Sequence, residues 1–181
     1  MRQVVRDFVA FCVEHLDLQE PVYDFGARSV PGGGSADMRG YFPDMEFVGA
    51  DLEEGPGVDV VLDLHHIDVP TASVGTVLIL DTLEHVEYPR QAIDEVWRIL
   101  KPNGVLIVTT VLNFHIHSEP DYWRFTPDGM RSLLKDFPAG FVVSSGHSKF
   151  PSAVMGVGLM EDRPADVSKG YARAWKEEER K

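Results

Sequence analysis

Residues 76–110 read TVLILDTLEHVEYPRQAIDEVWRILKPNGVLIVTT, and this segment is the strongest indication of the fold. Its two ends, residues 76–80 and 105–110, are runs of apolar and β-branched residues, which is typical of strands buried on both faces. Between them, residues 89–100 carry apolar side chains at helical spacing, and their leading proline suits a first helical turn. This order predicts two parallel strands joined by a crossover helix.

The rest of the chain continues this alternation of strands and helices. Residues 2–16 form a helical pattern with one apolar face, and Pro21 closes it. Further strands are expected at residues 22–25, 46–50, 59–62, 141–144 and 153–160, and further helices from Ser35 to Tyr41 and over residues 126–135. A short loop joins the last two strands, so they are expected to pair antiparallel. The sequence therefore predicts an α/β fold: a doubly wound, mostly parallel seven-stranded sheet with helices on both faces and an antiparallel last strand.

Length and composition predict one globular domain. The chain has 181 residues, of which 44% are hydrophobic and 25% charged, and these values are ordinary for a soluble protein. Within the single domain we expect an N-terminal helix over residues 1–18 and a core over residues 20–160. Residues 161–181 are expected to form a charged, mobile helix or tail.

Charge and cysteine content limit the partners and the compartment. The formal net charge is −12, so the surface as a whole would repel a nucleic-acid backbone or an anionic membrane. No apolar run is long enough to span a membrane, and the N-terminus lacks a secretion signal. Cys12 is the single cysteine, so no internal disulfide can form. We expect a cytoplasmic protein that binds neither nucleic acid nor membrane.

In a doubly wound sheet, ligands bind outside the carboxyl ends of the strands. Gly26 follows the first strand, where a glycine lets the backbone approach a ligand closely. Asp51 ends the second strand and can accept hydrogen bonds from ribose hydroxyls. Asp63 and Leu64 follow the third strand, where a carboxylate can accept from an adenine amine while leucine covers the ring. Taken alone, Gly26 fits an ordinary tight turn equally well, Asp51 fits a solvated surface acid better, and Asp63 fits a surface turn.

The phosphate-binding turn of a dinucleotide fold is incomplete here. Arg28 occupies the position of the second glycine in Gly-x-Gly-x-x-Gly, and this departure disfavours a nicotinamide or flavin dinucleotide. The sequence also lacks a Tyr-x-x-x-Lys pair. An NAD-dependent oxidoreductase is therefore the weaker alternative.

Several of these segments, taken together, resemble the class I S-adenosylmethionine-dependent methyltransferases, and most closely their type-11-like group. The resemblance spans residues 20–145. It is carried by VYDFGAR (22–28), FVGAD (47–51), GVDVVLD (57–63), LEHV (83–86), WRILKPNG (97–104) and PDYWRFT (120–126). It implies a Rossmann-like methyltransferase fold and S-adenosylmethionine as cofactor. Two departures are Arg28, where glycine is commoner, and Asn103, where the turn usually has glycine.

The resemblance also implies which residues hold the cofactor. Gly26 and its neighbours would line the methionine moiety, Asp51 would hold the ribose, and Asp63 with Leu64 would hold the adenine. Leu80 and Asp81, at the end of the fourth strand, would flank the sulfonium. The full implied set is Asp24, Phe25, Gly26, Ala27, Arg28, Asp51, Leu52, Asp63, Leu64, Leu80 and Asp81. Its carboxylates suit a cationic sulfonium electrostatically.

The loop after the fifth strand, residues 113–124, is expected on the acceptor side. His117 and Tyr122 are the catalytic candidates there, and Asp121 is a further candidate for acceptor contact. The alternative is that the loop's aromatic residues pack it onto the sheet while Arg124 pairs with a carboxylate. Glu84–His85, after the fourth strand, could supply a base or could simply pack a turn.

Histidines raise the question of a metal. His115 and His117 with His65 and His66 form a histidine-rich set, but neither a helical His-x-x-x-His pair nor cysteines support it. We therefore predict no metal site.

The sequence predicts methyl transfer to a small-molecule or glycan-type acceptor by in-line displacement, the glycan direction coming only from the resemblance. A general base is needed only if the acceptor must lose a proton. The alternative from another class is a catalytically degenerate adenosyl-binding domain. The amphipathic N-terminal helix could cover the sheet or bury against a second subunit, so a homodimer stays open.

Overall fold

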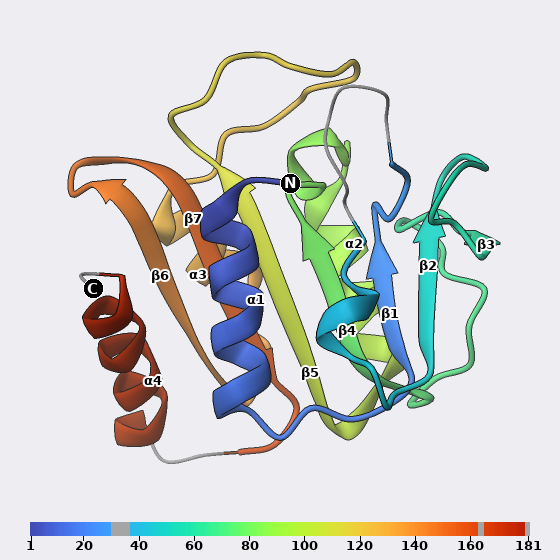
Figure 1. Cartoon of the computed structure of the whole chain (residues 1–181), viewed down its shortest axis with the longest axis horizontal. Coiled ribbons are helices and arrows are strands. Elements are labelled where there is room, and N and C mark those ends of the chain that lie inside the picture. The colour runs from blue at the N-terminus through green and yellow to red at the C-terminus, as the bar shows by residue number, and fades with distance from the viewer. Residues whose placement is uncertain (30–36, 163–164, 180–181) are drawn as a thin grey trace.

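The computed structural model of the chain describes residues 1–29, 37–162 and 165–179. Its centre is a seven-stranded sheet with the order β3-β2-β1-β4-β5-β7-β6 (Figure 1). The strands are β1 (Val22–Phe25), β2 (Phe47–Asp51), β3 (Val60–Val61), β4 (Val74–Leu80), β5 (Leu100–Val111), β6 (Ala139–His147) and β7 (Phe150–Leu159). Strands β1 to β5 pair in parallel, and β7 runs antiparallel to both β5 and β6. The predicted fold class is confirmed.

The sheet reverses its strand order at β1, and this places the ligand site. Strand β1 pairs with β2 on one side and with β4 on the other. Phe25, its last residue, stands opposite Ala50 of β2 and Ile79 of β4, so the three strands end at nearly the same level. The residues that follow β1, β2 and β4 therefore meet at one edge of the sheet, as the topology of such sheets requires.

Helices cover both faces of the sheet (Figure 1). Helices α2 (Pro89–Ile99) and α3 (Pro127–Leu133) lie on one face, and α1 (Gln3–His15) and α4 (Ala165–Glu178) lie on the other. Two short 3-10 helices complete the described elements. Helix η1 (Arg39–Tyr41) lies between β1 and β2 in the chain, and η2 (Leu83–His85) follows β4. None of the described helices is both long and apolar enough to cross a lipid bilayer.

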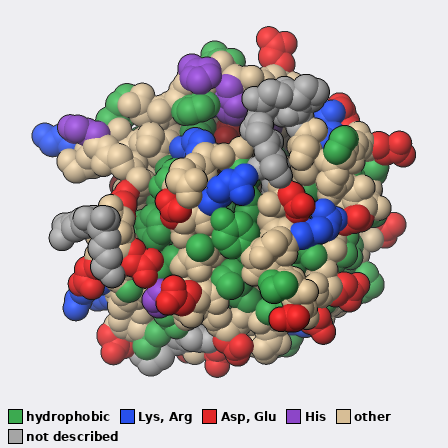
Figure 2. Space-filling model, viewed as in Figure 1, with side chains coloured by type: hydrophobic (Ala, Val, Ile, Leu, Met, Phe, Trp, Pro, Cys, Tyr) green, Lys and Arg blue, Asp and Glu red, His purple; other side chains and the backbone are tan. Residues whose placement is uncertain are grey.

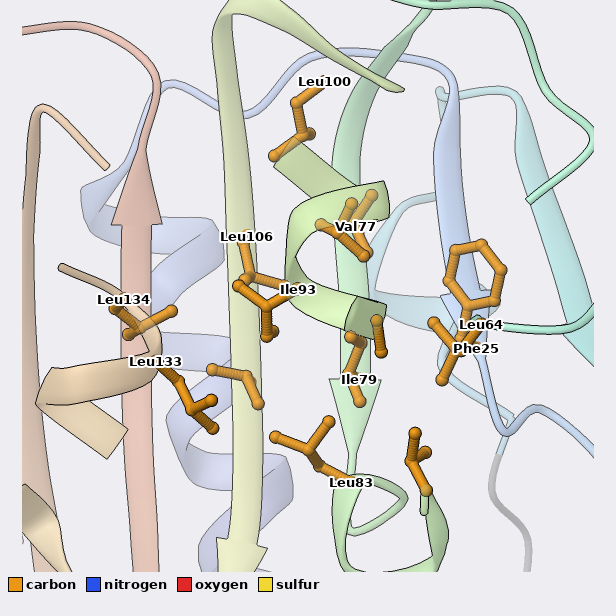
Figure 3. Packing of buried hydrophobic residues seen from close by; sticks show 14 of the residues in the cluster. Phe25, Leu64, Val77, Ile79, Leu83, Ile93, Leu100, Leu106, Leu133 and Leu134 are labelled. Carbon is orange, nitrogen blue, oxygen red and sulfur yellow. The ribbon is translucent and has the colours of Figure 1, made fainter. Parts of the chain in front are cut away.

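The α2 and α3 side of the core is a continuous apolar layer (Figure 3). Ile93 of α2 and Leu133 of α3 lie over Ile79 of β4 and Leu106 of β5, and all four side chains are buried. The apolar residues of α2 at helical spacing thus meet the strands whose apolar runs predicted burial on both faces.

The C-terminal segment, expected as a charged and mobile helix or tail, is helix α4 packed on the core. Trp175 is only 2% exposed. Its ring contacts Phe8 and Phe11 of α1, with centroid distances of 5.2 and 5.7 Å. The sequence pattern hid this because charged residues surround the one buried aromatic. The apolar face of α1 packs on the sheet, so its burial needs no second subunit.

Most element boundaries differ from the predicted ones by a few residues. Strand β5 begins at Leu100 and includes the predicted turn at residues 101–104, with an irregular register where it first pairs with β4. Strand β3 is only two residues long. Helix α3 starts after Thr126, whose hydroxyl accepts the backbone N–H of Gly129 at 3.0 Å. The expected cap Ser35 lies outside the described residues.

Candidate active site

A cleft of about 810 Å³ opens at the carboxyl ends of β1, β2 and β4. That volume falls in the range typical of small-molecule sites. Figure 2 shows histidine side chains gathered at the upper edge of the molecule, the edge toward which these strands point in Figure 1. The residues that line the cleft include Met1, Arg2, Phe25, Gly26, Arg28, Asp51, Leu52, Glu53, Asp63, Leu64, Leu80, Asp81, Thr82, Glu84, His85, Phe114, His115, His117, Glu119 and Pro120.

Gly26 forms the tight turn that opens the cleft after β1. Its φ is +92°, and its N–H donates to the carbonyl of Ala50 at 2.9 Å. A Cβ at this position would lie 2.1 Å from the Thr82 hydroxyl oxygen, which itself donates to the Phe25 carbonyl at 3.2 Å. Both the backbone conformation and the space therefore require glycine here.

Asp51 stands at the end of β2 and is held by backbone donors. Its carboxylate accepts the N–H of Arg28 and the N–H of Glu53, each at 3.2 Å. The Arg28 guanidinium lies 3.8 Å from Asp51 and 2.9 Å from Glu53. The arginine that departs from the glycine pattern thus lies beside two carboxylates at the wall of the cleft.

Asp63 and Leu64 lie in the turn after β3. The Asp63 carboxylate accepts the backbone N–H of His65 and contacts the His65 Nδ1, both at 2.8 Å. Leu64 is buried and belongs to the apolar core, so its side chain is a fixed apolar wall of the cleft. Leu52 is exposed at the cleft's rim.

Asp81 follows β4 in a left-handed conformation, with φ of +49°. Its N–H donates to the Thr109 carbonyl at 3.0 Å, and the Thr109 hydroxyl donates to its carboxylate at 3.0 Å. The Arg2 guanidinium binds both carboxylate oxygens, at 2.6 and 2.7 Å. Such strained backbone at a ligand site is common and is held in place by the structure around it.

The loop after β5 forms the far wall, and Arg124 organises it. Arg124 binds both carboxylate oxygens of Asp121, and the Nη2 contact is 2.8 Å. It also donates to the carbonyls of Phe114 at 3.2 Å and His115 at 3.0 Å. This guanidinium holds the pKa of Asp121 well below its usual range. Arg124 therefore pairs with a carboxylate, as the packing interpretation of the loop expected.

Glu84, His85 and His117 come together between β4 and this loop. His85 and His117 approach through their Nε2 atoms at 3.1 Å. The Glu84 side chain is buried, and its Oε2 accepts the Thr110 hydroxyl at 2.8 Å. Burial, with the nearby charge of Asp81, raises the pKa of Glu84 to about 7.

The structure brings most of the predicted site residues together. Nine of the eleven residues expected at the cofactor line the cleft, together with His117. Asp24 and Ala27 are buried and do not line it. Burial raises the pKa of Asp24 to about 7. Tyr122 also lies outside the lining: its side chain is half exposed, and its backbone N–H donates to the Glu84 carbonyl at 2.8 Å.

Sequence reasoning missed Arg2, Thr82 and the convergence of Glu84 with two histidines. Arg2 meets Asp81 across 79 residues of sequence, and His85 meets His117 across 32. No local spacing signals such contacts. The LEHV segment was a usable hint, since it places a carboxylate and an imidazole directly after a central strand.

Comparisons with known proteins agree with this geometry. A family model described as a methyltransferase domain matches residues 33–108. A search of curated proteins finds no matching sequence.

Solved methyltransferase structures share the fold at low sequence identity. The Burkholderia thailandensis 1,6-didemethyltoxoflavin-N1-methyltransferase, with 1,6-didemethyltoxoflavin and S-adenosylhomocysteine bound, is 17% identical with a TM-score of 0.64, covering 88% of this chain and 79% of its own. A SAM-dependent methyltransferase from Archaeoglobus fulgidus is 12% identical with a TM-score of 0.63, covering 88% and 94%. Another from Methanosarcina mazei is 13% identical with a TM-score of 0.59, covering 90% and 99%.

At these identities the solved structures show only the fold, whereas the family model matches a methyltransferase domain. The match over residues 33–108 is to a methyltransferase domain, and together with the fold and the cleft at the switch of strand order it supports a class I S-adenosylmethionine-dependent methyltransferase.

Proposed function

We propose that the chain methylates a small-molecule or glycan-type acceptor held against the loop after β5. One observation carries this proposal: a single cleft runs from the acidic ends of β2 and β3, past Asp81, to the wall made by Phe114, His117 and Glu119. A nucleoside at the first end and an acceptor at the second would meet beside Asp81.

The residues present fit S-adenosylmethionine, which supplies an electrophilic methyl group on a cationic sulfonium. Asp51 would accept from the ribose hydroxyls, because it lines the cleft and the N–H groups of Arg28 and Glu53 hold its carboxylate in place. Asp63 and Leu64 would hold the adenine, one as a hydrogen-bond acceptor and one as an apolar surface. Gly26 keeps the turn after β1 tight, since a Cβ there would collide with Thr82. Asp81 is the carboxylate placed to favour a positive charge.

The chain's part in the reaction is mainly positioning. In-line displacement needs the acceptor atom about 3–3.5 Å from the methyl carbon, so a rigid wall is worth more than a mobile one. Arg124 and Asp121 supply that rigidity by tying residues 114–124 together. His117 faces the cleft from this wall, and we propose that it contacts the acceptor. Tyr122, the second catalytic candidate, would reach an acceptor only from the rim.

Calorimetry of cofactor binding tests the nucleoside pocket. S-Adenosylmethionine and S-adenosylhomocysteine are expected to bind in the micromolar range, while NAD is not. Asp51→Ala should cost about 1–3 kcal/mol, or roughly 5- to 150-fold in Kd, because the ribose hydroxyls lose their acceptor. The matched control is Asp68→Ala, an exposed acid outside the cleft, which should change nothing.

Each other result has a definite meaning. Tight NAD binding would revive the oxidoreductase alternative, and equal effects of Asp51→Ala and Asp68→Ala would remove Asp51 from the pocket. An acceptor screen that follows S-adenosylhomocysteine release separates an enzyme from a degenerate domain. Cofactor binding without product across hydroxyl, amine and glycan acceptors would favour the degenerate domain.

The remaining expectations about partners stay predictions. The net charge of −12 still disfavours nucleic acid, and a cytoplasmic location rests on the single buried cysteine. A homodimer is testable by light scattering of the purified protein.

A further inference from the structure

Three metal-ligating side chains converge beside Asp81, on the acceptor side of the cleft. Glu84 and His85 come from η2, and His117 comes from the loop after β5. One carboxylate oxygen and one ring nitrogen from each histidine lie within 4.8 Å of one another. All three residues line the cleft.

The acceptors beside the two Nδ1 atoms indicate which nitrogen of each histidine ring carries the hydrogen and which carries the lone pair. The His85 Nδ1 lies 2.6 Å from the Pro120 carbonyl oxygen, which only accepts, so this nitrogen carries the hydrogen. The His117 Nδ1 lies 3.4 Å from a carboxylate oxygen of Asp121 and from the His115 carbonyl, which also only accept. With the hydrogen on both Nδ1 atoms, the tautomers that these acceptors favour, both Nε2 atoms carry lone pairs.

Those two lone pairs face each other at 3.1 Å. The contact is repulsive unless a positive charge lies between the nitrogens. A bound cation removes the repulsion, and 3.1 Å is close to the separation of two nitrogens that bind one zinc ion at about 2.0–2.1 Å each.

The buried carboxylate of Glu84 also indicates a bound cation, independently of the two histidines. The residue has no exposed surface, and among the described residues none offers a hydrogen bond to its Oε1. Its other oxygen is already satisfied by Thr110. An unpartnered buried carboxylate oxygen is costly, and a metal ion is one of the few partners that compensates it.

We propose that Glu84, His85 and His117 bind a divalent transition-metal cation, Zn²⁺ first, with a coordination position open to the cleft. Two imidazoles and one carboxylate form the donor set of catalytic zinc sites, which keep one position free. Magnesium is a poorer fit, because it prefers oxygen ligands. The site differs from the histidine set considered from sequence, since neither His65 nor His66 takes part.

If the chain transfers methyl groups as proposed, the metal site also indicates which class of acceptor it takes. A cation with a free position binds an oxygen and lowers the pKa of a hydroxyl that it holds. The acceptor is then a hydroxyl-bearing molecule, oriented by the metal beside Asp81. In this arrangement His117 is a metal ligand, and its proposed contact with the acceptor runs through the metal.

The test is zinc binding to the full chain after removal of metal with a chelator. Titration with ZnCl₂ should show one site per chain, and CoCl₂ should give visible absorption bands of nitrogen-bound cobalt. His85→Ala, His117→Ala and Glu84→Gln should each weaken zinc binding by at least about tenfold, since even lost second-shell contacts cost that much. Circular dichroism checks that each variant is folded.

The chain offers matched controls. Glu14, His15 and Glu178 form a second, more exposed cluster, in which the His15 Nδ1 contacts the Phe11 carbonyl. His15→Ala and His115→Ala should leave the high-affinity zinc site intact. Zinc binding that is lost in His15→Ala but survives His85→Ala would overturn the proposal, as would no zinc binding to the stripped wild-type protein.

Cofactor titrations on the same samples keep the two proposals apart. If the wild-type protein binds S-adenosylhomocysteine normally but does not bind zinc, only the metal-site proposal is contradicted. Zinc binding without adenosyl binding contradicts only the proposed function.

Discussion

At the scale of single residues, the fold changes the protonation of Glu84. Its pKa is about 7 in the folded chain and near 4.5 when unfolded, because burial penalises the carboxylate. Below pH 4.5 both states are protonated and the penalty is absent. As pH rises from 4.5 to 7, only the unfolded state loses the proton, so the free energy of unfolding falls. Above pH 7 the penalty is constant.

We therefore expect Glu84→Gln to stabilise the metal-free protein by up to about 3 kcal/mol at pH 8 and by under about 1 kcal/mol at pH 5. Urea denaturation in chelator at both pH values measures this. Glu14→Gln, an exposed change, is the control. If the free energies of unfolding of Glu84→Gln and wild type differ by the same amount at pH 5 and pH 8, the burial of an ionisable carboxylate is contradicted. Added zinc should raise the free energy of unfolding of the wild-type protein at pH 8 and leave that of Glu84→Gln unchanged.

At the scale of elements, α4 shows how one aromatic can dock a charged helix. Trp175 inserts against Phe8 and Phe11, and its ring is almost fully buried. Trp175→Ala should lower the free energy of unfolding by about 3–5 kcal/mol, because it leaves a large cavity between α1 and α4. Urea denaturation followed by circular dichroism measures the loss.

Trp97 is the matched control, since it is 45% exposed on α2. Its replacement by alanine should cost under about 1 kcal/mol. Trp175→Phe should keep most of the stability, because the indole N–H has no partner among the described residues. Equal losses for Trp97→Ala and Trp175→Ala would mean that α4 is not docked.

At the scale of the whole molecule, the N-terminus closes the cleft. Figure 1 shows the start of α1 at the edge where the central strands end, and Arg2 reaches Asp81 there. This pairing partly neutralises the carboxylate that the family resemblance places near the sulfonium. Arg2 therefore moderates the negative charge of the cleft in which we propose that the cofactor binds.

Arg2→Gln should raise the ratio of S-adenosylmethionine to S-adenosylhomocysteine affinity by about threefold to tenfold, an effect of about 1 kcal/mol. The reason is that only the methylated compound carries the sulfonium charge. Calorimetry with both compounds at low salt measures the ratio, and the exposed Arg173→Gln is the control. An unchanged or lower ratio would place Asp81 away from the sulfonium.

How far the sequence alone reaches depends on the range of the contacts involved. Apolar runs such as residues 105–110 follow from local chemistry, so the parallel core and the antiparallel last strand could be predicted. Gly26, Asp51 and Asp63 could be placed because the carboxyl ends of parallel strands meet at one edge. Boundaries were less accurate: β5 and β7 extend beyond their most apolar residues, because neighbouring strands supply hydrogen bonds that propensity does not encode.

Periodicity and strand-end position are properties of short segments, so the layered α/β fold and the acidic end of the cleft could be predicted from the sequence alone. Only the tertiary structure decided the pairing of Arg2 with Asp81, the docking of Trp175, and the meeting of Glu84 and His85 with His117. Those contacts join segments 32 or more residues apart, and their formation depends on how helices and loops settle on the finished sheet.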